Sequence, residues 1–386
     1  MDMRPSLEAP RKTASIRQVA PLKIHALTSV RFFAAVYVIL FHSQSEISPH
    51  GYIAEVLKLG YIGPYFFFAL SGYILSLVYL QRGESIDIRR FFVARFARIY
   101  PLYVVSLLLD IPFAVAARVA RYGVLFASVR VGGLFARSCI MLQMFAPADN
   151  ALNIPSWTIA IEAVFYLTFP WLGPRIWKLS GRAALLALCG LCVGGVALDR
   201  LIVFTRGNVL PATHLVSFLT VFAAGICLAR WQAVRQQAQG AGHRNHTMGW
   251  IAILTAALIF FPVVSMRARL ISLGLNPPYL LTPVFLALIW FLTQDNNYAT
   301  RWLNAKWLVV LGEASYALYL LQNPVGNTMR RLGLAGAAWD FPLYLCVCTS
   351  LSVLSFYFFE TPCRRWILRR FHTPTKETME AASSAQ

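Results

Sequence analysis

The sequence predicts an all-α membrane protein that crosses the bilayer about ten times. Of its 386 residues, 58% are hydrophobic and 13% are charged, whereas a soluble domain has about 45–50% apolar and about 25% charged residues. Apolar runs of about 20 residues, the length that a spanning helix needs, recur along the whole chain. These runs are continuous rather than alternating, which excludes a porin-like barrel.

Short polar stretches separate ten segments that are predicted to span the membrane. Their approximate bounds are 24–42, 59–80, 99–117, 155–173, 183–198, 211–229, 249–265, 277–293, 307–325 and 341–359. Residues 1–21 contain no apolar signal-peptide core and are predicted to be a disordered cytoplasmic tail. Residues 22–372 then form the transmembrane domain, and residues 373–386 form a second disordered tail.

An eleventh apolar segment, residues 131–147, is short and contains Arg137. Lys and Arg concentrate in the cytoplasmic loops of membrane proteins. With ten spans and a cytoplasmic N-terminus, 23 Lys and Arg residues lie inside and 11 outside, whereas an eleventh crossing gives 16 inside and 17 outside. The charge rule favours ten spans with both termini in the cytoplasm. Residues 131–147 are then interfacial, re-entrant or buried.

The formal net charge of +19 has an explanation other than nucleic-acid binding. The basic residues gather in short loops between apolar segments, where a cytoplasmic orientation requires them. Most of the seven cysteines lie within apolar runs, and the pair Cys189 and Cys192 has no further ligands nearby. We therefore expect no metal site and no redox site.

The first predicted span contains two polar residues, Arg31 and His42, eleven positions apart. Eleven residues of helix turn through about 20° more than three full turns and rise about 16 Å, so both side chains share one face. A charged side chain within the bilayer costs a few kcal/mol and usually faces a cavity or a partner. We predict a polar seam from Arg31 on the inner side to His42 at the outer boundary. Snorkelling of Arg31 and interfacial anchoring of His42 are the alternative.

A second intramembrane charge, Glu162, lies in the segment SWTIAIEAVFYLTFP. Counted from the outer surface, helical rise places it about 10 Å deep, within reach of His42 if the two helices are neighbours. A carboxylate beside an imidazole fixes the tautomer and raises the basicity of the histidine, as a general base requires. A structural ion pair between Glu162 and an arginine is the alternative.

A basic stretch, RRFFVARFARIYPLY, runs directly into the third predicted span. Arg95 and Arg98 are i,i+3 neighbours nearest the bilayer, where they are suited to bind phosphate from the cytosol. Arg89 and Arg90 need no role beyond the positive-inside pattern.

Other polar positions within the spans are expected to be structural. Ser71 and Gly72 are small residues at mid-span, which usually mark close helix packing, although Ser71 as a nucleophile is the alternative. Glu360 precedes a basic run, and an ion pair is its expected role.

Six motifs resemble, in the same order, those of acyltransferase family 3, which comprises integral membrane O-acyltransferases. The resemblance covers roughly residues 24–366. LTSVRFFAAVYVILFH is similar to the family's motif of Arg, ten residues and His, and FFVARFARIYPLY to its arginine-rich segment. The remaining similar segments are FFFALSGYILS, SWTIAIEAVFYLTFP, LGEASYALYLLQNPV and ETPCRRW.

This resemblance implies a ten-helix domain in a bacterial inner membrane. It also implies transfer of an acyl group, commonly acetyl from cytosolic acetyl-CoA, to a hydroxyl of a cell-surface or exported glycan or glycolipid, with no bound cofactor. By motif position, His42 is the essential histidine, Glu162 its acidic partner, and Arg31, Arg95 and Arg98 are donor-side residues. Many relatives have His at the position of Gln322, so no catalytic role is predicted there.

The rival function is a proton-coupled transporter or glycan exporter, because proton relays also use intramembrane Arg, His and Glu. No inverted repeat is evident in the sequence, which disfavours a transporter. No appended soluble domain is expected, because the chain ends soon after the tenth predicted span. Direct transfer and a relay through acylated His42 both remain open, as do the acceptor, the acyl length and the oligomeric state.

Overall fold

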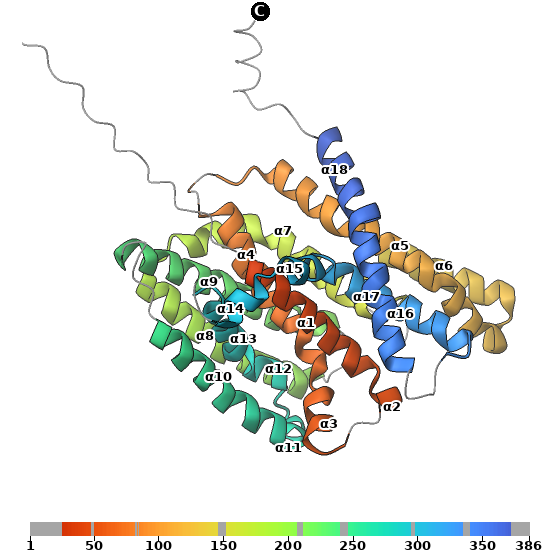
Figure 1. The fold of residues 1–386 in the computed structure, drawn as a ribbon, viewed down its shortest axis with the longest axis horizontal. Helices are drawn as coiled ribbons and strands as arrows, with labels where there is room; N and C mark the ends of the chain where they lie inside the picture. The colour runs from red at the N-terminus through yellow and green to blue at the C-terminus, as the bar shows by residue number, and fades with distance from the viewer. Residues whose placement is uncertain are drawn as a thin grey trace, which may run out of the picture.

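The described part of the chain is helical throughout. The structure, a computed structural model, describes residues 25–47, 50–81, 83, 85–145, 152–206, 211–239, 246–294, 298–334 and 340–371. These residues contain helices and no β-strand, which confirms the predicted all-α class (Figure 1). The predicted disordered tails, 1–21 and 373–386, lie outside the described residues.

Helices occupy all ten segments that the sequence predicts as spans. They are α1 (His25–His42), α2 (Gln44–Ile47), α3 (Gly51–Lys58), α4 (Gly63–Tyr79), α5 (Ile88–Tyr122), α6 (Val124–Cys139), α7 (Trp157–Trp177), α8 (Gly181–Arg206), α9 (Leu215–Gln239), α10 (His246–Ser265), α11 (Arg267–Ser272), α12 (Pro277–Leu280), α13 (Thr282–Leu292), α14 (Tyr298–Leu303), α15 (Lys306–Glu313), α16 (Ser315–Arg331), α17 (Asp340–Ser355) and α18 (Thr361–Arg370). Short 3-10 turns η1 (Gly60–Ile62), η2 (Gln143–Phe145), η4 (Ile154–Ser156) and η5 (Pro211–His214) and the π-helical turn η6 (Phe356–Glu360) complete them. Among the described residues, 6 helical stretches are long and apolar enough to cross a membrane alone, so the number of ten crossings stays a prediction.

In Figure 1, α1 lies in the middle of the view, beside α4 and α15. It packs against α4, α15 and α16, while α4 packs against α9 and α9 against α8. The two ends of the bundle are named here after the ends of α1. His25 shares a cavity with Arg364, so α18 begins at the His25 end. His42 shares a cavity with Arg330 and Asp340, so α16 ends and α17 begins at the His42 end.

Reciprocal glycines bring α4 and α9 together. A Cβ on Gly72 would collide with the backbone carbonyl of Phe222, and one on Gly225 would collide with that of Ala69. Such contacts allow two helix backbones to approach closely, as small residues do in membrane helix pairs. The close packing predicted at Ser71 and Gly72 is therefore confirmed.

Residues 131–147 do not form a continuous helix. After Gly123, whose φ of 74° is in the left-handed region, α6 turns back along α5. The hydroxyls of Tyr100 and Tyr103 on α5 donate to the carbonyls of Cys139 (3.2 Å) and Ser138 (2.7 Å) at the end of α6. These bonds satisfy the carbonyl groups of the helix end within the protein. The structure shows α6 as the second arm of a helical hairpin with α5, and its placement relative to the membrane stays a prediction.

A buried polar cluster ties the segment before α7 to α5 and α16. Asn153, in a left-handed conformation with φ of 49°, donates from its backbone N–H to Oδ2 of Asp110 at 2.8 Å. Its side chain donates to the carbonyl of Leu320 on α16 at 3.0 Å. Oδ1 of Asp110 accepts from Asn323 and Asn327, each at 3.1 Å. This cluster holds the start of α7 inside the bundle.

Two helix irregularities place acidic residues toward the His25 end. The helix pair α15 and α16 breaks at Ala314, directly after Glu313, and Ser315 Oγ donates to the carbonyl of Gly312 at 2.7 Å. The π-helical turn η6 ends at Glu360. Discontinuous and π-helical turns commonly accompany functional sites, because they redirect side chains that a regular helix would place elsewhere.

The reciprocal glycine contact predicts a selective loss of stability. Gly225→Val should lower the free energy of unfolding by about 1–3 kcal/mol, because the new side chain forces α4 and α9 apart. Thermal unfolding of the protein in detergent measures this effect, with the loss of the monodisperse species as the signal.

Gly190→Val on α8 is the matched control, because a Cβ there meets no atom within 4 Å. Both changes introduce the same β-branched residue into a helix, so intrinsic helix propensity cancels. Equal melting temperatures for the two variants would contradict the packing argument.

Candidate active site

Arg31 and His42 line two different cavities along α1. Arg31 lines a cavity of about 440 Å³ that also includes His25, and His42 lines a second cavity of about 200 Å³. Because α1 is continuous from His25 to His42, the two side chains share a face, as the eleven-residue spacing predicts. Arg31 is half-buried and His42 is exposed at the end of α1, so the polar seam runs from inside the bundle to its surface at the His42 end.

The larger cavity, called here the basic cavity, brings together four of the five predicted site residues. Its charged lining residues come from α1, α5, α7, α15 and α18: Arg31, Arg95, Arg98, Glu162, Glu313 and Arg364. Four guanidinium groups face two carboxylates, so the lining carries excess positive charge. The predicted common face of Arg95 and Arg98 is confirmed, because both line this cavity.

The guanidinium groups of the basic cavity are held in place but poorly paired. Arg95 donates to the hydroxyl of Tyr79 at 3.1 Å and lies over the rings of Tyr79 and Tyr166, at 5.5 and 5.8 Å from their centroids. Its Nε is buried without a partner. Within the described part of the chain, Arg31 and Arg98 form no hydrogen bond or ion pair. Unpaired guanidinium groups around a cavity of this size favour an anionic ligand.

Glu162 is bonded to hydroxyl groups. Its Oε1 accepts from Ser71 Oγ at 3.2 Å and from the hydroxyl of Tyr166 at 2.6 Å. It forms no ion pair with an arginine among the described residues, so the structural ion pair considered as the alternative is absent. These bonds also explain Ser71, whose hydroxyl supports the carboxylate.

The expected contact between Glu162 and His42 is not formed, because the two residues line different cavities. The depth of Glu162 was estimated as if α7 began at the membrane surface. Instead, Gln143 donates to the hydroxyl of Tyr103 and to the carbonyl of Ser156, both at 2.9 Å. The segment before α7 therefore enters the bundle, and Glu162 lies at the level of Arg31. Its catalytic role stays a prediction.

The smaller cavity, called here the His42 cavity, lies between α1, η4, α16 and α17. Its lining residues are His42, Ser43, Ile154, Pro155, Gln322, Asn323, Gly326, Met329, Arg330, Leu334, Asp340 and Tyr344. Gln322 is only 3% exposed, and its Nε2 donates to the carbonyl of Tyr319 at 2.7 Å. Its Oε1 is buried without a partner, which leaves an acceptor for a ligand hydroxyl.

One layer of side chains separates the two cavities. Thr158 and Tyr319 line the basic cavity, and their hydroxyl oxygens are 3.1 Å apart. Pro155 and Gln322, each three residues away along the chain, line the His42 cavity. Three helical residues span about 4.5 Å, so the barrier between the cavities is about one side chain thick.

Two charged residues of the basic cavity had no predicted role. Glu313 ends α15 at the helix break, and Arg364 lies on α18. With Arg98 and Glu360 they also line an adjoining cavity of about 30 Å³. The ion pair expected for Glu360 is not formed within the described residues, and its Oε1 is buried without a partner. The only sequence signal for Glu313 and Arg364 is that both lie in motifs that resemble those of the family.

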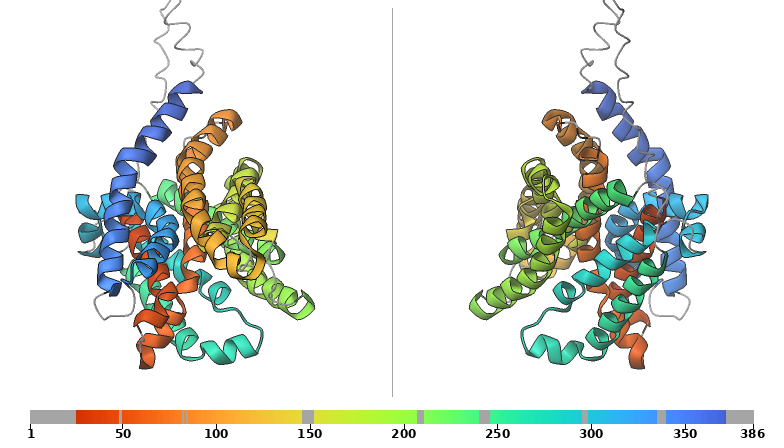
Figure 2. Two further views of the ribbon diagram at one scale, coloured as in Figure 1. Left: turned by 90° about the vertical axis from the view of Figure 1, so that its right-hand side faces the viewer. Right: turned by 90° about the vertical axis from the view of Figure 1, so that its left-hand side faces the viewer.

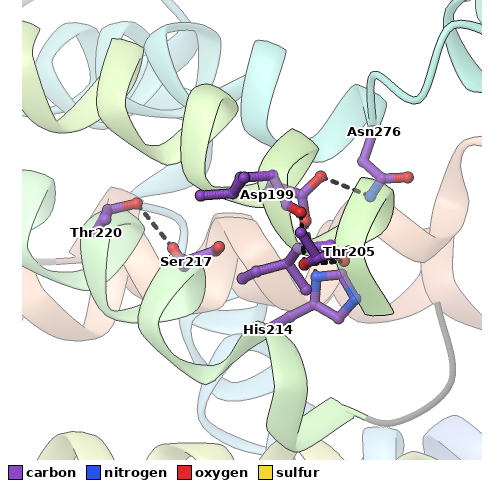
Figure 3. A network of polar contacts seen from close by, with 8 residues as sticks. Asp199, Thr205, His214, Ser217, Thr220 and Asn276 are labelled. Carbon is purple, nitrogen blue, oxygen red and sulfur yellow. Dashed lines mark hydrogen bonds and ion pairs between the residues drawn. The ribbon is translucent and has the colours of Figure 1, made fainter. Parts of the chain in front are cut away.

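A carboxylate–imidazole pair does exist, but other residues form it (Figure 3). Nδ1 of His214 lies 2.8 Å from Oδ1 of Asp199, and Asn276 donates to Oδ2 of Asp199 at 2.6 Å. Asp199 is 1% exposed and His214 is 8% exposed, and neither lines the basic cavity or the His42 cavity. The pair joins the end of α8 to η5 and to the residue before α12, so we assign it a structural role.

The described residues contain no group of three or more His, Cys, Asp or Glu side chains that could hold a metal ion. All seven cysteines are free.

Comparison with known proteins relates most of the chain to acyltransferases. Acyltransferase MdmB of Streptomyces mycarofaciens is 27% identical over 186 residues, which are 46% of this chain and 44% of that protein. The putative peptidoglycan O-acetyltransferase YrhL of Bacillus subtilis is 23% identical over 371 residues, covering 90% of this chain and 56% of YrhL. The peptidoglycan O-acetyltransferase OatA of Listeria monocytogenes is 22% identical over 360 residues, covering 89% of this chain and 56% of OatA.

This chain therefore spans about half the length of these relatives. No solved structure matches it significantly. Residues 24–360 match the family described as an acyltransferase domain, and this range contains nearly every residue that lines the two cavities. The chain belongs to that family, acyltransferase family 3.

Proposed function

We propose that this protein is a membrane O-acetyltransferase that uses acyl-CoA, commonly acetyl-CoA, and acts on a hydroxyl of a glycan or glycolipid. One observation carries the proposal: a single helix, α1, connects a basic cavity to a histidine-lined cavity, and one side-chain layer separates them. The relatives YrhL and OatA, named as peptidoglycan O-acetyltransferases, support a glycan as the class of acceptor.

In the proposed orientation the His25 end faces the cytoplasm of a bacterial inner membrane, and both termini are cytoplasmic. The distribution of Lys and Arg over the loops supports this orientation. The basic cavity then opens toward the compartment that contains acyl-CoA, and the His42 cavity opens toward the cell surface.

On the donor side, Arg95, Arg98 and Arg364 are proposed to bind the phosphates of acyl-CoA. Guanidinium groups suit this task because they stay charged and bind phosphate through two parallel hydrogen bonds. Arg31 lies further along the seam and is proposed to guide the acyl-bearing arm. The cavity volume of about 440 Å³ falls in the usual range for small-molecule sites, about 300–1,000 Å³.

On the acceptor side, His42 is proposed to remove the proton from the acceptor hydroxyl. The oxygen then attacks the thioester carbon, a C–O bond forms, the C–S bond breaks, and the departing thiolate takes up a proton to give free CoA. In the relay alternative, His42 attacks the thioester carbon, the C–S bond breaks, and the CoA thiolate leaves with the imidazole proton. The acceptor oxygen then takes the acyl group from the imidazole, and the hydroxyl proton returns to His42. Radiolabelled acetyl-CoA added without acceptor separates these routes, because only the relay labels the protein.

Glu162 is proposed to act within the basic cavity. Its carboxylate, fixed by Tyr166 and Ser71, lies close enough to Arg31 and Arg98 for their charges to interact. A fixed negative charge there limits the repulsion among the guanidinium groups when no donor is bound. This role replaces the direct orientation of His42 expected from the sequence.

The first functional prediction concerns His42. His42→Ala should lower the maximal rate of acetyl transfer by about 10²–10⁴-fold, the usual contribution of a general base. Mass spectrometry of surface glycans, together with acetyl-CoA consumption by the purified protein, measures the effect. The control is His50→Ala, because His50 is exposed and does not line the His42 cavity. Undiminished glycan acetylation by His42→Ala would refute the proposal.

The second functional prediction concerns donor binding. Arg98→Gln should raise KM for acetyl-CoA by about tenfold or more, because it removes a charge-assisted hydrogen bond to the donor. Arg89→Gln is the matched control: Arg89 belongs to the same basic stretch, is exposed, and does not line the cavity. Steady-state kinetics in detergent compare the two variants. Equal KM values would exclude a specific donor contact at Arg98.

A further inference from the structure

A large apolar groove runs along the outside of the bundle between α5 and α17. It has a volume of about 1040 Å³. Both α5 and α17 pack on α16 rather than along one another, so α16 forms the floor; Figure 2 shows α17 and α5 standing apart. Its lining residues are Leu102, Val105, Leu109, Pro112, Phe113, Leu321, Pro324, Val325, Thr328, Met329, Leu332, Leu334, Leu343, Val347, Leu351, Leu354, Ser355, Phe358 and Phe359.

Apolar lining alone is ordinary for a surface at membrane depth. The groove differs from such a surface because it is continuous with the His42 cavity. Met329 and Leu334 line both. A ligand can therefore have an apolar part in the groove and a polar part beside His42 without leaving the protein surface.

Positive charge marks the end where the groove meets the His42 cavity. Arg330 lines that cavity together with Asp340, and its Nη2 donates to Oδ1 of Asn327 at 2.9 Å, so two arginines and one carboxylate lie at this end. The guanidinium of the next residue, Arg331, lies over the ring of Phe113, 5.1 Å from its centroid, and Phe113 lines the groove. Both arginines are exposed. This junction is suited to an anionic group placed between an apolar chain and a polar head.

The opposite end of the groove lies beside α18 and η6. There α18 packs against α5, and Phe358 and Phe359 of η6 line the groove. From Leu343 to Phe359 the lining on α17 and η6 extends over sixteen residues, or about 24 Å of helix, which is most of the thickness of a bilayer core. The groove is thus a long apolar slot with one polar, cationic end.

We propose that this groove binds the lipid tail of the acceptor. The acceptor is then a glycan joined through a phosphate group to a long hydrocarbon chain, with the chain in the groove, the phosphate beside Arg330 and Arg331, and the glycan hydroxyl at His42. This inference rests on the proposed function, because it assigns the class of acceptor. Anchoring the tail would hold the hydroxyl at the reacting position and so reduce the entropy lost on transfer.

A binding experiment tests the groove without requiring catalysis. The intact protein in phosphatidylcholine nanodiscs is incubated with a long-chain polyprenyl phosphate that carries a diazirine in its tail, then irradiated and digested. Cross-links should fall on peptides of α16 and α17. Unlabelled polyprenyl phosphate should compete, whereas an equal amount of phosphatidylglycerol should not. Equal competition by phosphatidylglycerol would show a surface filled by bulk lipid and would overturn the inference.

The phosphate contact has its own test in the same assay. Arg331→Gln should reduce cross-linking by the polyprenyl phosphate by about tenfold, as expected for loss of a charge-assisted hydrogen bond. It should leave cross-linking by a diazirine-labelled polyprenol, which has no phosphate, unchanged. An equal loss for both probes would remove the anionic junction from the proposal.

A kinetic experiment tests whether the bound tail belongs to the acceptor. Wild-type protein should show a kcat/KM at least about tenfold higher for a lipid-linked glycan than for the same glycan without its tail. Val347→Trp, which fills the groove, should abolish this advantage. Cys346→Trp should retain it, because Cys346 is the exposed neighbour on α17 outside the groove.

The possible outcomes separate this inference from the proposed function. If the tail cross-links in the groove but no glycan is acetylated, the groove binds such lipids and the proposed transfer reaction is wrong. If both glycans are acetylated equally well, the transfer reaction stands and the acceptor tail does not use the groove. Equal behaviour of Val347→Trp and Cys346→Trp also rejects the groove.

Discussion

Guanidinium groups with few polar partners are costly to bury, and this protein keeps four of them around one cavity. Arg31 and Arg98 have no hydrogen bond or ion pair among the described residues, and Arg95 is held by aromatic side chains instead of carboxylates. Charges in this state persist only where water or an anionic ligand replaces the missing partner. The helix break after Glu313 lies at this cavity, and the π-helical turn η6 precedes Arg364, which lines it.

Two kinds of interaction hold the helices around the cavity: close backbone packing at glycines and a buried hydrogen-bond network. Backbone contact at Gly72 and Gly225 fixes α4 against α9, and dispersion contacts of this kind need no polar partner. Asp110 acts through hydrogen bonds that join α5, the segment before α7 and α16. Because that network crosses elements distant in sequence, it sets the level at which α7 begins, and therefore the cavity in which Glu162 lies.

The sequence predicted correctly those features that depend only on local helix geometry. The common face of Arg31 and His42 follows from eleven residues of unbroken helix, and that of Arg95 and Arg98 from three. The cavity in which Glu162 lies depends on Gln143, Tyr103 and Ser156, which long-range contacts bring together, so counting residues along α7 could not show that it neighbours Arg31 rather than His42. The pair of Asp199 and His214 was missed for the same reason. Neither residue lies in a motif, and the two are 15 residues apart in the sequence.

The layer of Thr158, Tyr319 and Gln322 lies between the two cavities and would limit the passage of water between them. An open channel between a thioester on one side and water on the other would allow hydrolysis to compete with transfer, and excluding water is the usual way for an enzyme to prevent this side reaction. In the proposed reaction the acyl carbon must pass a barrier about one side chain thick, or about 4.5 Å of helix. Three polar side chains suit such a barrier better than apolar ones. The hydroxyls of Thr158 and Tyr319 bond to each other, and Gln322 donates to the backbone carbonyl of Tyr319. A donor released from either bond can bind the passing acyl carbonyl.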